Sequence, residues 1–122
     1  MAKTFLIVDD SASMRQLVSS TIKGMGHSML IAENGRDALN KLGDGKIDIV
    51  ITDLNMPDMD GIELIKKLRS MPAHKFIPII ILTTDAQEEK KREAKQSGAS
   101  GWIVKPFSPE QLQDVINKFV KN

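Results

Sequence analysis

The stretch IVITD at residues 49–53 places an apolar, β-branched run directly before the carboxylate of Asp53. A short run of this kind is typical of a buried strand in a parallel sheet. Because open α/β sheets bind ligands at the carboxyl ends of their strands, polar residues that follow such runs should gather at one edge. Three further runs also end in polar residues: FLIV (5–8) before Asp9 and Asp10, IIIL (79–82) before Thr83, and IV (103–104) before Lys105.

Strand-like and helix-like segments alternate along the chain, which predicts repeated βα units. Such units give a parallel sheet with right-handed crossovers and helices on both faces, so the expected fold class is α/β. The most polar helix is expected over 86–97, where Ala86 and Ala94 form nearly all of the apolar stripe. The clearest helix begins with the cap Ser108 and the capping-box residue Gln111. The strands are expected at 5–8, 29–31, 47–52, 77–82 and 102–104.

Length and composition narrow the classes of protein. A chain of 122 residues suits one domain, so residues 1–122 are expected to form a single unit with no output domain attached. The chain has 17 basic and 16 acidic residues, and this balance gives no general attraction to nucleic acid or membranes. Without cysteine, disulfides and thiolate metal sites are excluded. No signal peptide or membrane-spanning stretch is visible, which predicts a cytoplasmic protein. His27 and His74 are expected in surface loops.

The acids expected at the sheet edge would crowd negative charge that a divalent cation could relieve. If they were unpaired, Asp9, Asp10 and Asp53 would raise one another's pKa values. Mg²⁺ prefers oxygen ligands and often joins a few carboxylates to a phosphate. Lys105 adds a positive charge and Thr83 adds a hydroxyl donor. A carboxylate nucleophile with these partners suits phosphoryl transfer through an aspartyl phosphate.

Four motifs follow the strand-like runs: VDD (8–10), TDLNMPDMDG (52–61), LTT (82–84) and GASGWIVKPF (98–107). Together they resemble the motifs of bacterial response-regulator receiver domains, and most closely those of single-domain chemotaxis regulators of the CheY type. The resemblance covers essentially the whole chain in the family's order and spacing. It implies a flavodoxin-like (βα)5 fold, a doubly wound five-stranded parallel sheet with strand order 2-1-3-4-5.

The resemblance implies roles for the acidic residues in a two-component phosphorelay. Asp53 matches the phosphoacceptor, which attacks a phosphohistidine of a partner histidine kinase. Asp9 and Asp10 match the acids that hold Mg²⁺ directly or through water, and Asp53 and the backbone carbonyl of Asn55 complete the implied metal site. Such a protein assists its own phosphorylation and hydrolysis but is not a turnover enzyme.

Other matched residues concern the response to phosphorylation. Lys105 matches the lysine that pairs with the phosphoryl group, and a cis peptide between Lys105 and Pro106 is implied. Thr83 matches the hydroxyl that moves to hydrogen-bond the phosphoryl group, and Trp102 stands at the aromatic switch position. We expect Trp102 to turn inward and change the surface formed by the fourth helix, fifth strand and fifth helix. The implied output partner is the flagellar motor switch protein or another protein; a phosphatase is left open as a partner, and a monomer is expected.

Several residues depart from the family pattern and bear on switching and on the partner. Trp102 replaces the usual Tyr or Phe, and Thr84 stands where familiar chemotaxis members have a smaller Ala. Gln87 and Val115 stand where those members have lysines. A phosphorelay shuttle or a phosphate sink without motor binding would share every site residue, and it stays open as the alternative.

Three rival functions match the residues less well. A haloacid-dehalogenase phosphatase would need an Asp general acid where Asn55 stands. A flavodoxin-like FMN binder would need a phosphate loop rich in Ser, Thr and Gly where Asp9 and Asp10 stand. An EF-hand loop starting at Asp53 lacks its required glycine and carries Pro57 at an unsuitable place.

Overall fold

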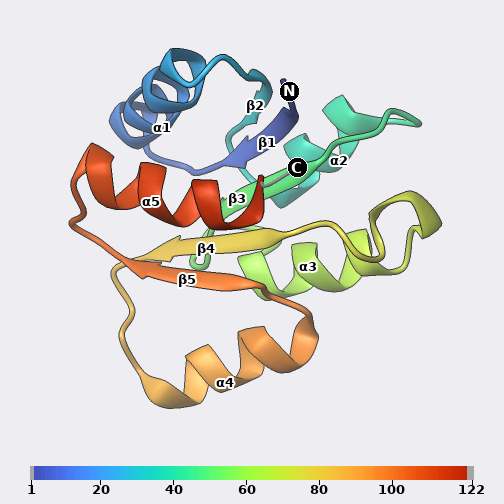
Figure 1. The fold of residues 1–122 in the computed structure, drawn as a ribbon. Coiled ribbons are helices and arrows are strands. Elements are labelled where there is room, and N and C mark those ends of the chain that lie inside the picture. The colour runs from blue at the N-terminus through green and yellow to red at the C-terminus, as the bar shows by residue number, and fades with distance from the viewer. Residues whose placement is uncertain (1, 121–122) are drawn as a thin grey trace.

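The computed structural model describes residues 2–120, which form one five-stranded parallel sheet between two layers of helices (Figure 1). The strand order is β2-β1-β3-β4-β5, so the predicted fold class and strand order are confirmed. The strands are β1 (Thr4–Val8), β2 (Ser28–Ala32), β3 (Ile49–Asp53), β4 (Ile79–Thr83) and β5 (Gly101–Val104). The helices are α1 (Ala12–Gly24), α2 (Gly35–Leu42), α3 (Gly61–Arg69), the 3-10 turn η1 (Pro72–His74), α4 (Glu88–Ser97) and α5 (Pro109–Phe119).

The sheet separates two aliphatic cores because successive strand residues point to opposite faces. Phe5 and Ile7 of β1 belong to the core that also contains buried residues of α1 and α5. Leu6 and Val8 belong to the other core, which α2, α3 and α4 cover. Burying one large aliphatic side chain stabilises the folded state by about 1.5–3 kcal/mol. The buried central strands therefore hold the residues at their ends in fixed positions.

Two of the central strands extend one residue further than predicted. Strand β3 ends at Asp53 rather than residue 52, and β4 ends at Thr83 rather than residue 82. The ladder pairs Asp53 with Leu82 and Thr83 with Val104. Both polar residues are therefore the last members of buried strands, and the sheet itself fixes their backbones.

Side-chain caps start most of the helices. Ser11 caps α1, Asn34 caps α2, and Ser108 forms the predicted capping box with Gln111 at α5. A second capping box, which is not among the features predicted from the sequence, joins Asp60 and Glu63 at the start of α3. Each such cap satisfies backbone N–H groups that the first turn of a helix leaves free.

Helix α4 begins at Glu88, two residues later than predicted. The backbone N–H of Gln87 donates to Oδ1 of Asp85 at 2.9 Å, so the preceding segment follows a turn and not a helix. Ala86 is exposed and lies outside the helix. Within α4, whose residues are all described, Ala94 is the one fully buried side chain.

One of the two histidines, His74, differs from the expectation of a surface loop. His74 lies in η1 and is only 2% exposed, so its expected place at the surface was wrong. Burial lowers the pKa of His74, and neither ring nitrogen has a hydrogen-bond partner among residues 2–120. His27 is half-buried, and its Nδ1 accepts a hydrogen bond from the N–H of Lys3 at 2.9 Å.

Among residues 2–120, no helix has the length and apolar character needed to cross a bilayer.

Candidate phosphorylation site

The turn after β1 fixes Asp9 from three directions. The N–H of Ser11 donates to Oδ1 of Asp9 at 2.9 Å, and Nη1 of Arg15 donates to the backbone carbonyl oxygen of Asp9 at 2.7 Å. Nζ of Lys105 donates to Oδ2 of Asp9 at 2.9 Å. The bonds from Ser11 and Lys105 satisfy the carboxylate of Asp9, which is only 3% exposed to water. Asp10, the next residue, is exposed. The same turn therefore presents one buried acid and one accessible acid.

Asp53 lies at the end of β3 and is held by the turn that follows it. The N–H of Leu54 donates to Oδ1 of Asp53 at 2.7 Å, which leaves Oδ2 on the side of Lys105. Gly61, the first residue of α3, packs directly on this turn and donates its N–H to Leu54 at 2.7 Å. A Cβ at Gly61 would lie 2.5 Å from the carbonyl oxygen of Asp53, so only glycine allows this approach.

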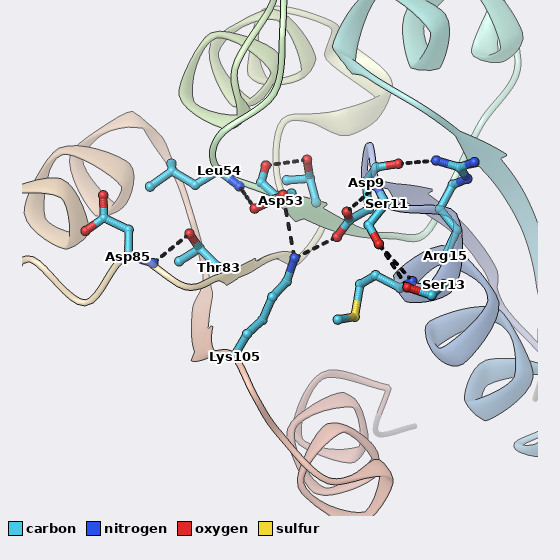
Figure 2. A network of polar contacts seen from close by, with 11 residues as sticks. Asp9, Ser11, Ser13, Arg15, Asp53, Leu54, Thr83, Asp85 and Lys105 are labelled. Atoms are coloured by element: carbon cyan, nitrogen blue, oxygen red, sulfur yellow. Dashed lines mark hydrogen bonds and ion pairs between the residues drawn. The ribbon is translucent and has the colours of Figure 1, made fainter.

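Lys105 links the acids of β1 and β3 (Figure 2). Its Nζ lies 2.9 Å from Oδ2 of Asp9 and 3.6 Å from Oδ2 of Asp53. Its backbone N–H donates to the carbonyl of Thr83 at 2.7 Å, which ties the lysine to the end of β4. The peptide between Lys105 and Pro106 is cis, as the resemblance implied.

The three carboxylates form a compact cluster of negative charge. Oxygens of Asp9, Asp10 and Asp53 all lie within 4.8 Å of one another. Burial raises the pKa of Asp53; the Lys105 ammonium opposes this rise, and the Asp9 carboxylate adds to it. One ammonium does not balance three carboxylates. Oxygen donors at this spacing can hold a hard divalent cation such as Mg²⁺.

Asn55, Thr83 and Trp102 are the remaining residues to which the resemblance assigned a role. Asn55 is exposed in the loop after Asp53, which contains Asp58 in the left-handed region at φ 69°. Thr83 is fully buried, and its Oγ1 accepts a hydrogen bond from the N–H of Asp85 at 3.1 Å (Figure 2). Trp102 pairs with Ile81 in the sheet, two positions before the partner of Thr83.

Trp102 borders both the α4 and the α5 sides of β5. It is half-buried and packs against the core covered by α2, α3 and α4. A hollow of about 250 Å³ lies beside it on the side of Lys91 and Lys95 of α4. A wider hollow of about 450 Å³ lies between it and α5, near Phe107 and Val115. Trp102 thus helps to line both hollows.

Sequence reasoning did not anticipate the supports around Asp9. Arg15 lies six positions after Asp9, and its guanidinium reaches back to the turn that joins the two neighbouring acids. The N–H of Ser11 holds the carboxylate of Asp9 while the side chain of Ser11 caps α1. A serine after adjacent acids and an arginine in the next helix are common features, so the pattern alone carried no signal.

The fold and the site together define a receiver. The model of the response regulator receiver domain matches residues 5–117, and the chain belongs to this family. Receivers of this family are phosphorelay signalling proteins, and the comparisons support that general function here.

Within the family, the chain resembles CheY proteins of chemotaxis. It is 40% identical to chemotaxis protein CheY-3 of Vibrio cholerae over 114 residues, which is 93% of this chain and 88% of that protein. It is 42% identical to chemotaxis protein CheY1 of Helicobacter pylori over 112 residues, 89% of this chain and 90% of that protein. The structure of CheY4 of Vibrio cholerae superposes with a TM-score of 0.93 at 43% identity, covering 98% of this chain and all of that one.

Proposed function

We propose that Asp53 receives a phosphoryl group from a phosphohistidine of a histidine kinase. The observation that carries this proposal is the meeting of three carboxylates and one ammonium at the ends of β1, β3 and β5. Asp9, Asp10 and Asp53 have oxygens within 4.8 Å of one another, and Nζ of Lys105 lies 3.6 Å from Oδ2 of Asp53. Phosphoryl transfer depends mainly on this kind of positioning and charge balance.

The nucleophile in this proposal is Oδ2 of Asp53. Its Oδ1 already accepts the N–H of Leu54, whereas Oδ2 is on the side of Lys105. Oδ2 attacks phosphorus, the P–N bond to the kinase imidazole breaks, and the electron pair of that bond stays on the imidazole nitrogen. The ammonium of Lys105 then lies beside the new phosphoryl oxygens and balances their charge.

Asp9, Asp10, Asp53 and the backbone carbonyl of Asn55 are the groups proposed to hold Mg²⁺. The fit rests on the chemistry of the donors, because all of them offer hard oxygen atoms and three carry negative charge in one cluster. Bound there, Mg²⁺ would supply charge neutralisation during transfer. Lys105 keeps Asp9 in place, and Leu54 keeps the Asp53 carboxylate oriented.

The response to phosphorylation is proposed to start at Thr83. Its hydroxyl would leave the N–H of Asp85 to donate to the phosphoryl group, which vacates space near β5. Trp102 would then turn inward, and the hollows beside it give the ring room to move. The surface formed by α4, β5 and α5 would change as a result, and the output partner would read that change.

A cytoplasmic monomer that acts as one receiver domain would suit this role. The proposed output partner is a flagellar motor switch protein, with a phosphorelay shuttle or phosphate sink as the alternative. Two residues on the proposed output surface favour the alternative. Gln87, which is exposed, and Val115, which is half-buried, stand where familiar chemotaxis members have lysines. Hydrolysis of the aspartyl phosphate would reset the domain, with or without a phosphatase.

Phosphotransfer from a histidine kinase carrying a radiolabelled phosphohistidine tests the proposal. We expect the label to move to the wild-type chain and not to Asp53→Asn. Label on Asp53→Asn at the wild-type rate would overturn the assignment of the acceptor. Titration of a motor switch protein, with and without beryllofluoride, then separates motor regulation from a shuttle or sink.

A further inference from the structure

Arg69, the last residue of α3, joins three parts of the chain at the edge of the sheet far from the phosphorylation site. Its Nε and Nη2 donate to the carbonyl of Gly98 at 3.2 and 2.6 Å. Its Nη1 donates to the carbonyls of His74 and Lys75 at 3.0 and 3.1 Å. Gly98 is the C-cap of α4, so one guanidinium holds the end of α3, the end of α4 and the turn before β4.

Gly98 is shaped to receive this guanidinium. It adopts φ +119°, a conformation that L side chains rarely adopt. A Cβ at this position would also lie 2.8 Å from Nε of Arg69, so a side chain would push the arginine away. The N–H groups of Gly98 and Ala99 both donate to the carbonyl of Ala94, which closes the helix at the same point.

The opposite end of α4 is held much less firmly. Gln87, its N-cap, makes no side-chain capping bond among the described residues. The approach to α4 depends on two bonds in series, from Asp85 N–H to Thr83 Oγ1 and from Gln87 N–H to Asp85 Oδ1. Because α4 runs antiparallel to β4, this weak end lies at the edge of the sheet that carries the site (Figure 1).

We propose that Arg69 is a positioning residue that fixes the C-terminal end of α4, so that α4 responds by swinging its N-terminal end about Gly98. The single buried residue Ala94 lies near that fixed end and offers little resistance to such a swing. The trigger rests on the proposed function, because it starts with the Thr83 hydroxyl leaving Asp85. The clamp itself is a property of the unphosphorylated protein.

Hydrogen exchange of the unphosphorylated protein tests the clamp. In Arg69→Gln we expect the amides of Gly98 and Ala99 to exchange about tenfold faster than in wild type, because charge-assisted bonds at that end are lost. The amide of Lys91, nearer the other end, should keep its wild-type rate. Arg69→Lys, which keeps the charge but not the planar fork, should fall between the two. Arg92→Gln, an exposed arginine of α4, is the matched control and should change neither end.

Equal acceleration along all of α4 in Arg69→Gln, or no change at Gly98 and Ala99, would overturn the clamp. If Arg69→Gln fails to fold, Arg69→Lys answers the same question, since a clamp predicts faster exchange confined to the C-terminal end. Circular dichroism of each variant shows beforehand whether the fold is intact.

Distance measurements between spin labels test the swing. The chain has no cysteine, so label pairs are introduced cleanly as Ser20→Cys with either Glu89→Cys or Gln96→Cys, all at exposed positions. With Mg²⁺ and beryllofluoride, we expect the distance to position 89 to shift and the distance to position 96 to stay unchanged. In the Arg69→Gln background both distances should shift. Equal shifts at both positions in the wild-type background would overturn the swing.

Intact mass after treatment with acetyl phosphate separates the two levels of proposal. Phosphorylation of Asp53 without a larger shift at position 89 overturns the swing alone. Absence of phosphorylation overturns the proposed function, and the clamp is then judged by exchange in the unphosphorylated protein.

Discussion

Lys105 and Asp9 form the shortest ion pair of the site, with Nζ 2.9 Å from Oδ2 across 96 positions of sequence. Two strands, β3 and β4, separate β1 from β5 in the sheet, so the lysine side chain spans their ends to reach Asp9. Asp9 is therefore already balanced by a cation, whereas Asp10 is exposed to solvent. The two neighbouring acids should consequently behave differently when substituted.

Magnesium should stabilise the folded chain, and the two acids should contribute to this effect in different ways. Binding to the folded state alone adds about 1.4 kcal/mol at a Mg²⁺ concentration ten times the Kd. Asp10→Ala should blunt this gain and change the stability of the metal-free protein by less than about 0.5 kcal/mol. Asp9→Ala should blunt the gain and also cost about 1–3 kcal/mol without metal, because it removes the 2.9 Å ion pair and leaves Lys105 only its longer contact with Asp53.

Thermal unfolding across millimolar MgCl₂ measures both effects, with NaCl at matched ionic strength as the control. A midpoint that does not respond to Mg²⁺ would contradict a metal site at these carboxylates.

Asp53→Asn should stabilise the protein at neutral pH in the absence of divalent cations. The pKa of Asp53 is raised, first by burial and then by Asp9, against the opposing charge of Lys105. When the pKa of a carboxyl group is raised in the folded state, the free energy of unfolding falls as pH rises from the unfolded pKa through the folded one. The ionised form of Asp53 therefore weakens the fold at neutral pH. The difference between variant and wild type should shrink as pH falls toward the unfolded value of 3.8.

Urea unfolding at several pH values in EDTA measures this difference. Asp44→Asn, at an exposed loop position, serves as the control for removing one negative charge. A wild-type protein that is more stable than Asp53→Asn at neutral pH would contradict the electrostatic description of the site.

Gly61→Ala should both destabilise the fold and impair the site. The new methyl group would lie 2.5 Å from the carbonyl oxygen of Asp53, which is backbone and cannot yield easily. We expect a loss of about 2 kcal/mol or more, together with slower phosphorylation of Asp53. Gly24→Ala is the matched control, because nothing lies within 4 Å of its added Cβ, and it should stabilise by about 0.4–1 kcal/mol or stay neutral. Equal stabilities for the two variants, measured by urea unfolding, would refute the close packing of Gly61 on β3.

His74 should make the protein less stable in mild acid. Burial lowers its pKa in the folded state below the ordinary value of 6.5, so the unfolded chain binds a proton that the folded chain does not. Stability should therefore fall as pH decreases through the region below 6.5. His74→Phe should flatten this pH dependence between about pH 7 and 5. His27→Gln is the control for the second histidine, whose pKa is also lowered by burial. A slope that His74→Phe leaves unchanged would show that His74 does not titrate with unfolding.

The sequence was most informative where chemistry and periodicity coincide. Apolar runs that end in Asp53, Thr83 and Lys105 predicted parallel strands, and parallel strands bring their ends together whatever the loops between them do. The cap at Ser108 was equally local, since a capping box lies within four consecutive residues. For these strands and this cap, the residues that produce the structure lie next to one another in the sequence.

Features that depend on distant backbone atoms could not be predicted in this way. Arg69 reads as an ordinary polar end of a helix, and its partners are carbonyls of Gly98, His74 and Lys75 placed by tertiary packing. His74 is buried because η1 packs on α3, although the sequence predicted a surface loop at this position. The late start of α4 similarly depends on a bond between Asp85 and Thr83, whose position the sheet sets.

Intact mass after incubation with acetyl phosphate tests the central claim most directly. We expect wild type to gain one phosphoryl group only when Mg²⁺ is present, and Asp53→Asn to gain none under either condition. A gain by Asp53→Asn equal to that of wild type, or no gain by folded wild type with Mg²⁺, would contradict Asp53 as the phosphoacceptor of this site.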